Sequence, residues 1–246
     1  MKQFSPLKTF NLAMSFLTFF VVTGLGGFAP ASAQLQFLPT PPDQGAPTGR
    51  QRGGATRGDC LAYQDLRALV PEIDGVVWSQ TASDTPSFFF EVPTAITTET
   101  PLEFVIQDSN DDYAVRKRFS IDTVAGIIEI PVAKGETSLI PGQNYSWTLS
   151  IYCDAARPSA SVSVSGTLQR VADFSTATTI PEMTPEEQIE RIQQYATEGI
   201  WHEATVLALV LHQTAPNNAD YLETLESLFG QAGFVDLSLS APIFTL

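Results

Sequence analysis

The sequence predicts a β-sandwich of about seven strands followed by a small α-helical region. Between residues 60 and 171, short segments rich in β-branched and aromatic residues are separated by connections rich in Pro, Gly, Asp, Asn and Thr. After residue 183 the apolar residues recur every three or four positions, which is typical of helices. The chain has 246 residues, of which 43% are hydrophobic, so one or two domains with a sizeable core are expected.

The first 33 residues have the features of an export signal. Lys2 and Lys8 give a positive start, residues 10–28 carry no charge, and Ala31-Ser32-Ala33 fits an A-x-A cleavage site before Gln34. The alternative is an uncleaved anchor, although 19 uncharged residues are barely enough to span a bilayer. We therefore expect a periplasmic or extracellular protein with no transmembrane segment in the mature chain.

The mature chain would be strongly acidic. It would hold 11 Lys and Arg residues against 27 Asp and Glu residues, a formal net charge of −16. The negative electrostatic field of such a charge argues against nucleic acid or an anionic membrane as a partner. Solubility is the simpler explanation of the charge.

Residues 34–59 are rich in Pro and Gly and predict a flexible arm. Arg50, Arg52 and Arg57 lie within it and suggest an anion-binding loop supported by exposed glycine amides. The alternative is a solvated arm that lies on its own acidic domain. No strand precedes the arm and no Lys-Ser or Lys-Thr pair follows, so it is not a P-loop.

Residues 60–171 are expected to form the sandwich, because about seven short strands with regularly spaced turns are typical of that fold. Val162 and Val164 alternate with serines, so the last strand should have one buried face. Residues 88–90 are three phenylalanines and predict a strand covered on both faces. The expected strands are Ala68–Val70, Phe88–Val92, Leu102–Gln107, Tyr113–Phe119, Ile127–Pro131, Tyr145–Tyr152 and Ser161–Leu168.

The stretch from residue 139 to residue 153 is expected to contain the central strand. Tyr145, Trp147, Leu149 and Ile151 recur at every second position, so all four side chains should share one face. The stretch ends at Cys153. The turn Leu139-Ile140-Pro141-Gly142-Gln143-Asn144-Tyr145 resembles the L-x-P-G-x-x-Y turn of fibronectin type III domains, which implies that the Tyr145 hydroxyl bonds back to the upstream backbone as a tyrosine corner.

Cys60 and Cys153 are the two cysteines of the chain. In an exported protein they are expected to pair and to join the arm to the sheet. Two free thiols or part of a metal site are the alternatives, and two cysteines without a nearby histidine do not make a zinc site.

Residues 172–183 are expected to form a linker, and residues 184–233 a helical region. Thr184, Pro185 and Glu187 match an N-cap, the first helical position and a capping box. Two further helices are expected from Trp201 to Gln213 and after Asn218, and the apolar tail at residues 234–246 is long enough for one more short strand.

Two further resemblances concern the helices and the whole mature chain. The pattern helix, Gly199, Trp201, Glu203-Ala204, helix resembles a single tetratricopeptide-type unit, which cannot bury its face alone and should pack on the sandwich. The arm up to Cys60, the segment P-S-F-F-F-E-V-P, the central strand and the terminal helices together resemble a secreted cyanobacterial family, domain of unknown function number 928. That resemblance implies export and supplies no catalytic residue.

The chain contains few residues that suggest catalysis or metal binding. Residues 108–112 contain D-x-N-x-D, but an EF-hand would need Gly and Glu where Tyr113 and Phe119 stand, so a polar hairpin tip is favoured over a weak calcium site. His202 and His212 are too far apart along one helix to chelate a metal together, and His202 is expected on the surface. No cofactor, metal or catalytic residue is predicted.

Aromatic side chains offer a further possible site. Phe88, Phe90, Trp78, Trp147 and Tyr152 could form a sugar-binding platform, with Trp78 and Tyr152 the most exposed, or could belong to the core. Taken together, the sequence predicts a non-enzymatic, envelope-associated binding or structural module whose partner is a protein or polysaccharide. The alternative is a glycan- or cell-wall-acting hydrolase with an unrecognised carboxylate pair.

Overall fold

The computed structural model describes residues 49–53, 58–132, 138–154, 156–172 and 183–246. The chain divides into two units, residues 1–33 and 34–246, and every described residue belongs to the second. The predicted export signal, its cleavage site at Ala33 and Gln34, and Arg57 therefore lie outside the described residues.

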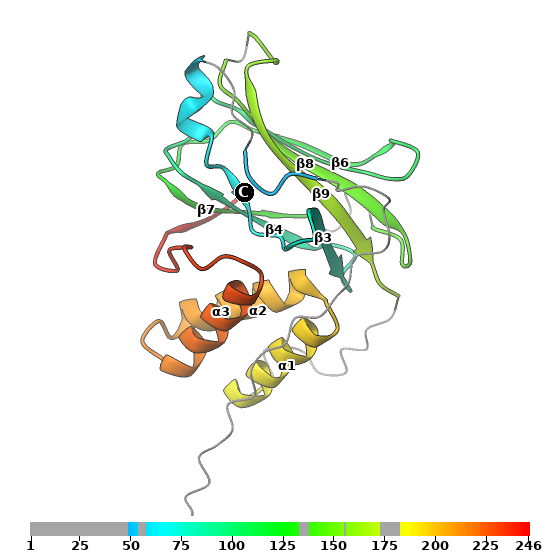
Figure 1. Cartoon of the computed structure of the whole chain (residues 1–246), viewed down its shortest axis with the longest axis vertical. Helices are drawn as coiled ribbons and strands as arrows, with labels where there is room; N and C mark the ends of the chain where they lie inside the picture. The colour runs from blue at the N-terminus through cyan, green and yellow to red at the C-terminus, as the bar shows by residue number, and fades with distance from the viewer. Residues whose placement is uncertain (1–48, 54–57, 133–137, 155, 173–182) are drawn as a thin grey trace, which may run out of the picture. The chain divides into compact units, whose positions relative to one another are not determined.

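The described part of the chain contains two β-sheets (Figure 1). The larger sheet has the order β2-β3-β9-β8-β5-β6 and the smaller has the order β1-β4-β7-β10. Neighbouring strands are antiparallel except for two parallel pairs, β3 with β9 and β10 with β7. The strands are β1 Arg67–Ala68, β2 Glu72–Ile73, β3 Val76–Thr81, β4 Ser87–Val92, β5 Leu102–Gln107, β6 Tyr113–Phe119, β7 Gly126–Pro131, β8 Asn144–Tyr152, β9 Ser161–Arg170 and β10 Ile243–Thr245.

All seven predicted strands are present, and β10 occupies the apolar tail. The first of them is displaced and shorter than predicted, while the other six agree to within two residues. Strands β2 and β3 were not predicted from the sequence. Their signal was Asp74-Gly75, which joins them in a tight turn with φ values of 52° and 79°. Positive φ at two successive residues is the requirement of a type I′ hairpin turn, for which Asp-Gly is a preferred pair.

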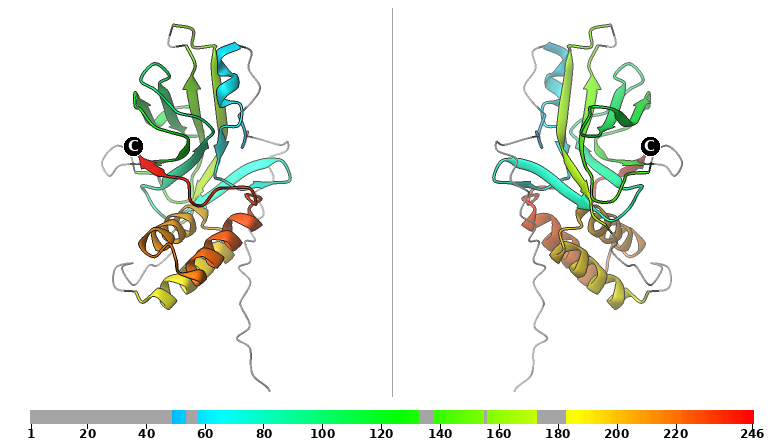
Figure 2. Two further views of the ribbon diagram at one scale, coloured as in Figure 1. Left: turned by 90° about the vertical axis from the view of Figure 1, so that its left-hand side faces the viewer. Right: turned by 90° about the vertical axis from the view of Figure 1, so that its right-hand side faces the viewer.

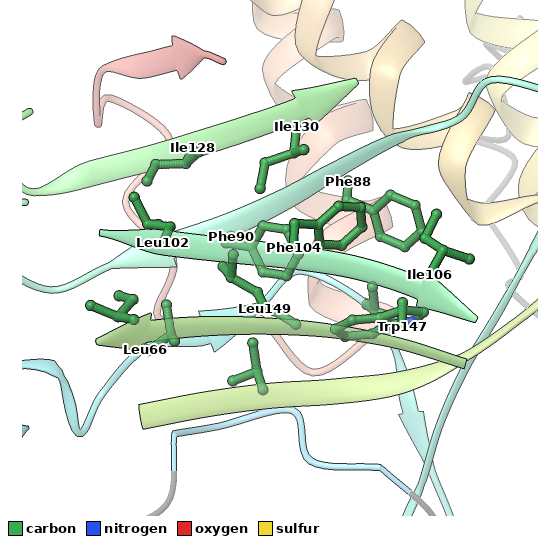
Figure 3. Close-up of a cluster of buried hydrophobic side chains, with 14 of the residues drawn as sticks. Leu66, Phe88, Phe90, Leu102, Phe104, Ile106, Ile128, Ile130, Trp147 and Leu149 are labelled. Atoms are coloured by element: carbon green, nitrogen blue, oxygen red, sulfur yellow. The ribbon is translucent and has the colours of Figure 1, made fainter. Parts of the chain in front are cut away.

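The space between the sheets is filled by apolar side chains (Figure 3). Strand β8 lies between β9 and β5, and its residues Tyr145, Trp147, Leu149 and Ile151 are all buried. The period of two along the sequence therefore marked the central strand of the larger sheet correctly.

The phenylalanines of β4 are buried on both faces of the smaller sheet. Phe88 and Phe90 point into the space between the sheets, and both contact Trp147 edge-on or tilted, with ring centroids 5.7 and 5.9 Å away. Phe89 points to the other side and belongs to a second apolar cluster with the helices. The prediction of a strand covered on both faces is confirmed.

Three helices pack together at one end of the sheets (Figures 1 and 2). They are α1 Pro185–Thr197, α2 Trp201–Thr214 and α3 Ala219–Gln231. The capping box of α1 is present: the Thr184 side chain accepts from Glu187 N, and the Glu187 side chain accepts from Thr184 N. Trp201 at the start of α2 donates its Nε1 hydrogen to the carbonyl of Leu69, 2.8 Å away, and so ties the helices to the smaller sheet.

Three further contacts tie loops and the arm to the sandwich. Cys60, in the 3₁₀ helix Gly58–Tyr63, forms the predicted disulfide with Cys153 at the end of β8. The Tyr145 hydroxyl accepts a hydrogen bond from the backbone N–H of Ile140, 2.8 Å away. Residues 49–53 form bridges to β9 and to β1, so this described part of the arm is hydrogen-bonded to both sheets.

Candidate functional site

The larger sheet has a polar face that points away from the sandwich core. Along β8 and β9, buried residues alternate with partly exposed ones, and the partly exposed positions are almost all hydroxyl-bearing. Antiparallel pairing places these side chains opposite each other in rows. One such pair, Ser150 and Ser163, is hydrogen-bonded at 2.8 Å. We call this surface the outer face; its hydroxyl residues are Ser146, Thr148, Ser150, Tyr152, Ser161, Ser163, Ser165 and Thr167.

One side of the outer face carries arginine and tyrosine side chains. The Tyr152 hydroxyl donates to Glu103 Oε2 at 2.6 Å, and Arg116 Nε donates to Glu103 Oε1 at 2.9 Å. The Arg116 guanidinium lies 4.9 Å from the centroid of the Tyr113 ring, and that of Arg118 lies 5.2 Å from the Tyr152 ring. Glu103, Tyr113, Arg116, Arg118 and Tyr152 thus form one cluster, which we call the edge cluster.

Glu103 is the anion that orders the edge cluster. The hydrogen bond from Tyr152, followed by that from Arg116, lowers the pKa of Glu103, so the carboxylate stays charged at neutral pH. Its two oxygens are each used within the cluster. Arg118 lies opposite Glu103 across the β5–β6 pair and attracts its charge, but within the described residues its guanidinium makes no hydrogen bond, so its N–H groups remain available to a ligand.

Arg50 lies on the opposite side of the outer face. Arg50 and Ser165 exchange both backbone hydrogen bonds, at 2.6 and 2.8 Å, so the two side chains share one face. The register continues through Thr148 and Val105 to Arg116. Four strand spacings separate Arg50 from Arg116, a distance of about 19 Å.

Arg50 and Arg52, the two described arginines of the predicted anion-binding loop, bridge to different sheets. Arg50 lies on the outer face, whereas Arg52 bridges to β1 and its guanidinium lies 3.8 Å from Asp236. Arg57 lies outside the described residues. The position of Arg50 beside β9 could not be predicted from the composition of the arm. Only the pairing with Ser165 determines on which face of the larger sheet the Arg50 side chain lies.

A buried arginine that the sequence analysis did not single out anchors the C-terminal tail. Arg67 is 2% exposed, donates to Glu91 Oε2 at 2.5 and 2.8 Å, and donates to Asp236 Oδ1 at 2.6 Å. Its guanidinium also lies 5.5 Å from the centroid of the Phe234 ring. These contacts join β1 to the segment after α3 and give Arg67 a structural role.

His202 is buried, so its predicted surface position is wrong. It is 2% exposed, since the start of α2 packs against β3 and the inner side of β4. Its Nδ1 lies 2.8 Å from the Ser87 carbonyl and its Nε2 lies 2.9 Å from Ser79 Oγ. Because a carbonyl can only accept, Nδ1 carries the proton and Nε2 accepts from Ser79. Burial lowers the pKa of His202 to about 4, so the imidazole is neutral.

The Ser79–His202 pair does not present a nucleophile. Ser79 is fully buried, so its hydroxyl has no access to a substrate. The histidine holds the start of α2 against the edge of the sandwich.

Beside this pair lies a cavity of about 180 Å³, which we call the junction cavity. The β3–β4 loop contributes Ser83, Thr85 and Pro86, and the helices contribute Tyr195, Glu203 and Val206. A second cavity, of about 370 Å³, lies between α3 and the following segment and is lined by Glu226 and apolar residues. Each of the two cavities is lined by one carboxylate, so neither brings together the pair that a glycosidase needs.

Two other expectations concern aromatic and acidic residues. Trp78 is 3% exposed, so the prediction that it is accessible is wrong, and Phe88, Phe90 and Trp147 are core residues. Tyr152 is partly exposed and belongs to the edge cluster.

Asp108 folds back at the β5–β6 tip and accepts from the backbone N–H groups of residues 110 and 112, at 2.8 and 3.1 Å.

Across the ranges that the structure describes, no three or more His, Cys, Asp or Glu side chains gather as metal ligands would. Within those same ranges, no helix combines the length and apolar character needed to cross a bilayer.

The fold and its surfaces define a β-rich protein with a disulfide, three C-terminal helices and a polar sheet face. Residues 52–242 match the family model described as Domain of Unknown Function (DUF928), and the chain belongs to that family. A search of curated proteins found no match.

Proposed function

We propose that this protein is an exported, envelope-associated binding module, without catalytic activity, that binds a polysaccharide through the outer face. The observation that carries the proposal is the juxtaposition of rows of hydroxyl side chains with Arg50 on one side and the edge cluster on the other. Export is supported by the A-x-A pattern before Gln34 and by a disulfide, which forms and persists in oxidising compartments.

The chemistry of the outer face favours a carbohydrate over a protein partner. Protein interfaces have an apolar or aromatic centre surrounded by a polar rim. The centre of this face consists instead of serine and threonine, with Val105 as the apolar residue of its middle row. Hydroxyl and guanidinium groups hydrogen-bond to sugar hydroxyls, and exposed tyrosine rings such as Tyr113 stack on sugar rings.

The charge of the protein limits the kind of polysaccharide. The mature chain has a formal net charge of −16, which repels a densely charged polyanion. The outer face itself holds Arg50, Arg116 and Arg118 against Glu103. A neutral or weakly acidic polysaccharide satisfies both conditions.

The sandwich belongs, in our interpretation, to the immunoglobulin and fibronectin type III class. The order β1-β4-β7 in one sheet and β9-β8-β5-β6 in the other agrees with strands A-B-E and G-F-C-C′ of that class. The hydrogen bond to the Tyr145 hydroxyl at the start of β8 agrees with its tyrosine corner. We likewise interpret α1 and α2 as a tetratricopeptide-like pair that packs on the sandwich instead of forming a groove.

The experiment compares binding of the oxidised protein to sedimented peptidoglycan and exopolysaccharide with that of two outer-face variants. We expect Arg118→Ser to weaken binding about tenfold, because one charge-assisted hydrogen-bonding group is lost. Thr148→Glu should weaken it further by placing an unpaired charge at the centre. Arg157→Ser and Thr197→Glu make the same changes at exposed positions elsewhere and should bind like the wild type. Equal retention of all five proteins would contradict the proposed surface.

A further inference from the structure

The junction cavity contains a carboxyl group that is only half satisfied. Glu203 Oε1 accepts from Thr81 Oγ1 at 2.6 Å and from the backbone N–H of Ser83 at 3.0 Å. Glu203 Oε2 is buried and has no hydrogen-bond partner within the described residues. Because nearly all buried polar atoms in proteins are paired, an unpaired carboxyl oxygen on a side chain that lines a cavity indicates a missing partner. Oε2 is closed off in this conformation, so a rotation of the carboxyl group has to turn it toward the cavity.

The walls of the junction cavity indicate what that partner is. Pro86, Val206 and the ring of Tyr195 give apolar surface, and Ser83 and Thr85 add hydroxyl groups that can accept hydrogen bonds. His202 also lines the cavity, but both of its ring nitrogens are already bonded. None of the described residues that line the cavity is Lys or Arg, so nothing in the wall supplies a positive charge to Glu203.

We propose that the junction cavity binds a primary alkylammonium group, with the ammonium on Glu203 and the aliphatic chain against Pro86, Val206 and Tyr195. The ammonium can come from a free small amine or from a lysine side chain of a partner protein. The chemistry is the same in both cases: three N–H donors and one positive charge meet a buried carboxylate and two hydroxyl oxygens. This site is independent of the outer face.

Binding at this site shifts the ionisation of Glu203 toward the carboxylate. Burial raises the pKa of Glu203, so the empty site favours the neutral acid more than an exposed glutamate would. An ammonium ion stabilises the carboxylate, so the fraction of Glu203 that is protonated in the empty site releases its proton to solvent. The titratable and charged groups nearby are Arg191 and Tyr195 on α1, His202 on α2 and Asp84 on the loop. His202 is neutral above its pKa of about 4, so affinity should rise with pH through the raised pKa of Glu203.

The test measures the thermal stability and the heat of binding of the oxidised protein with n-butylammonium chloride. We expect n-butylammonium to raise Tm, whereas n-butanol and sodium butyrate at the same concentration and ionic strength should not. Calorimetry in two buffers of different ionisation enthalpy should report the release of protons. The Glu203→Gln variant should bind n-butylammonium at least about tenfold more weakly, and Glu226→Gln, which removes the same charge from α3, should bind like the wild type.

Two further measurements keep the proposal testable. If Glu203→Gln fails to fold, Val206→Phe fills the cavity without touching the carboxyl group and should abolish the Tm shift. A peptide with one lysine, acetyl-Gly-Lys-Gly-amide, distinguishes the sources: tighter binding than n-butylammonium indicates a partner's lysine, and weaker binding indicates a free amine. No Tm shift in the wild type, or an equal shift in Val206→Phe, would overturn the proposal. The cavity would then be interpreted as holding only water.

Discussion

The sandwich core and the junction between the helices and the sheets are held together by different chemistry. The space between the sheets is filled by apolar residues such as Phe90, Phe104 and Leu149. The buried polar side chains, in contrast, lie within the helices or on the strand residues that face the helices and the tail: Arg67, Ser79, Thr81, His202, Thr205 and Thr224. The sandwich should therefore tolerate changes of pH, while the junction should respond to them.

This difference also separates the two proposed sites. The outer face consists of surface side chains on a rigid sheet, so its residues can change without loss of the fold. The junction cavity is built from the same buried polar groups that fix α2, so a ligand there acts on the attachment of the helices. Binding at the two sites is expected to be independent.

The largest effect is expected from removal of the disulfide, which would weaken the sandwich and leave the junction contacts in place. Cys60 and Cys153 are 93 residues apart, and in the chain-entropy model closing such a loop contributes about 4–5 kcal/mol. We expect a Cys60→Ala/Cys153→Ala variant to lose about this much free energy of unfolding in urea. Reductant should destabilise the wild type and leave the double variant unchanged; a wild type that is indifferent to reductant would show that the bond contributes nothing.

Substitution of two neighbouring phenylalanines would test directly whether the sandwich and the helices unfold separately. Phe90→Ala and Phe89→Ala should each cost about 3–5 kcal/mol, because both side chains are buried. Hydrogen exchange should show lower protection in β5 and β8 for Phe90→Ala and in α2 and α3 for Phe89→Ala. Identical protection patterns in the two variants would mean that the sandwich and the helices unfold as one unit.

The pH dependence of stability tests the junction alone. The folded-state pKa of His202 is about 4, below its unfolded value of 6.5. Its contribution to the free energy of unfolding is therefore complete above pH 6.5 and is lost as the pH falls toward 4. The loss over this range should be about 3 kcal/mol. Glu203 has the opposite effect on the pH dependence. Because its pKa is raised in the folded state, its contribution to the free energy of unfolding is present at low pH and is lost as the pH rises through that pKa.

The measurement is the free energy of unfolding between pH 4 and pH 8. His202→Gln should reduce the slope below pH 6.5, and His212→Gln, which changes a partly exposed histidine at the other end of α2, should keep it. A slope that persists in His202→Gln would assign the pH dependence to carboxylates instead.

Local patterns were enough to predict most of the elements. The period of two in β8, the three phenylalanines of β4 and the capping box at Thr184 each depend on neighbours in the sequence, and each was located correctly. The Asp74-Gly75 turn was also readable in principle and was overlooked, because β3 is buried on both faces and its alternation is weak.

The sequence by itself determined the periodicities, the turn and cap residues, the pair of cysteines and the acidic charge, since these follow from residue type and spacing alone. Only the tertiary structure decided that His202 is buried, that Arg67 lies between Glu91 and Asp236, and that Arg50 shares a face with Arg116. The physical reason is that burial and charge pairing depend on segments far apart in the chain: Ser79 meets a histidine 123 residues away. Such contacts leave no local period, so both candidate sites emerged from the pairing of the strands and the docking of α2.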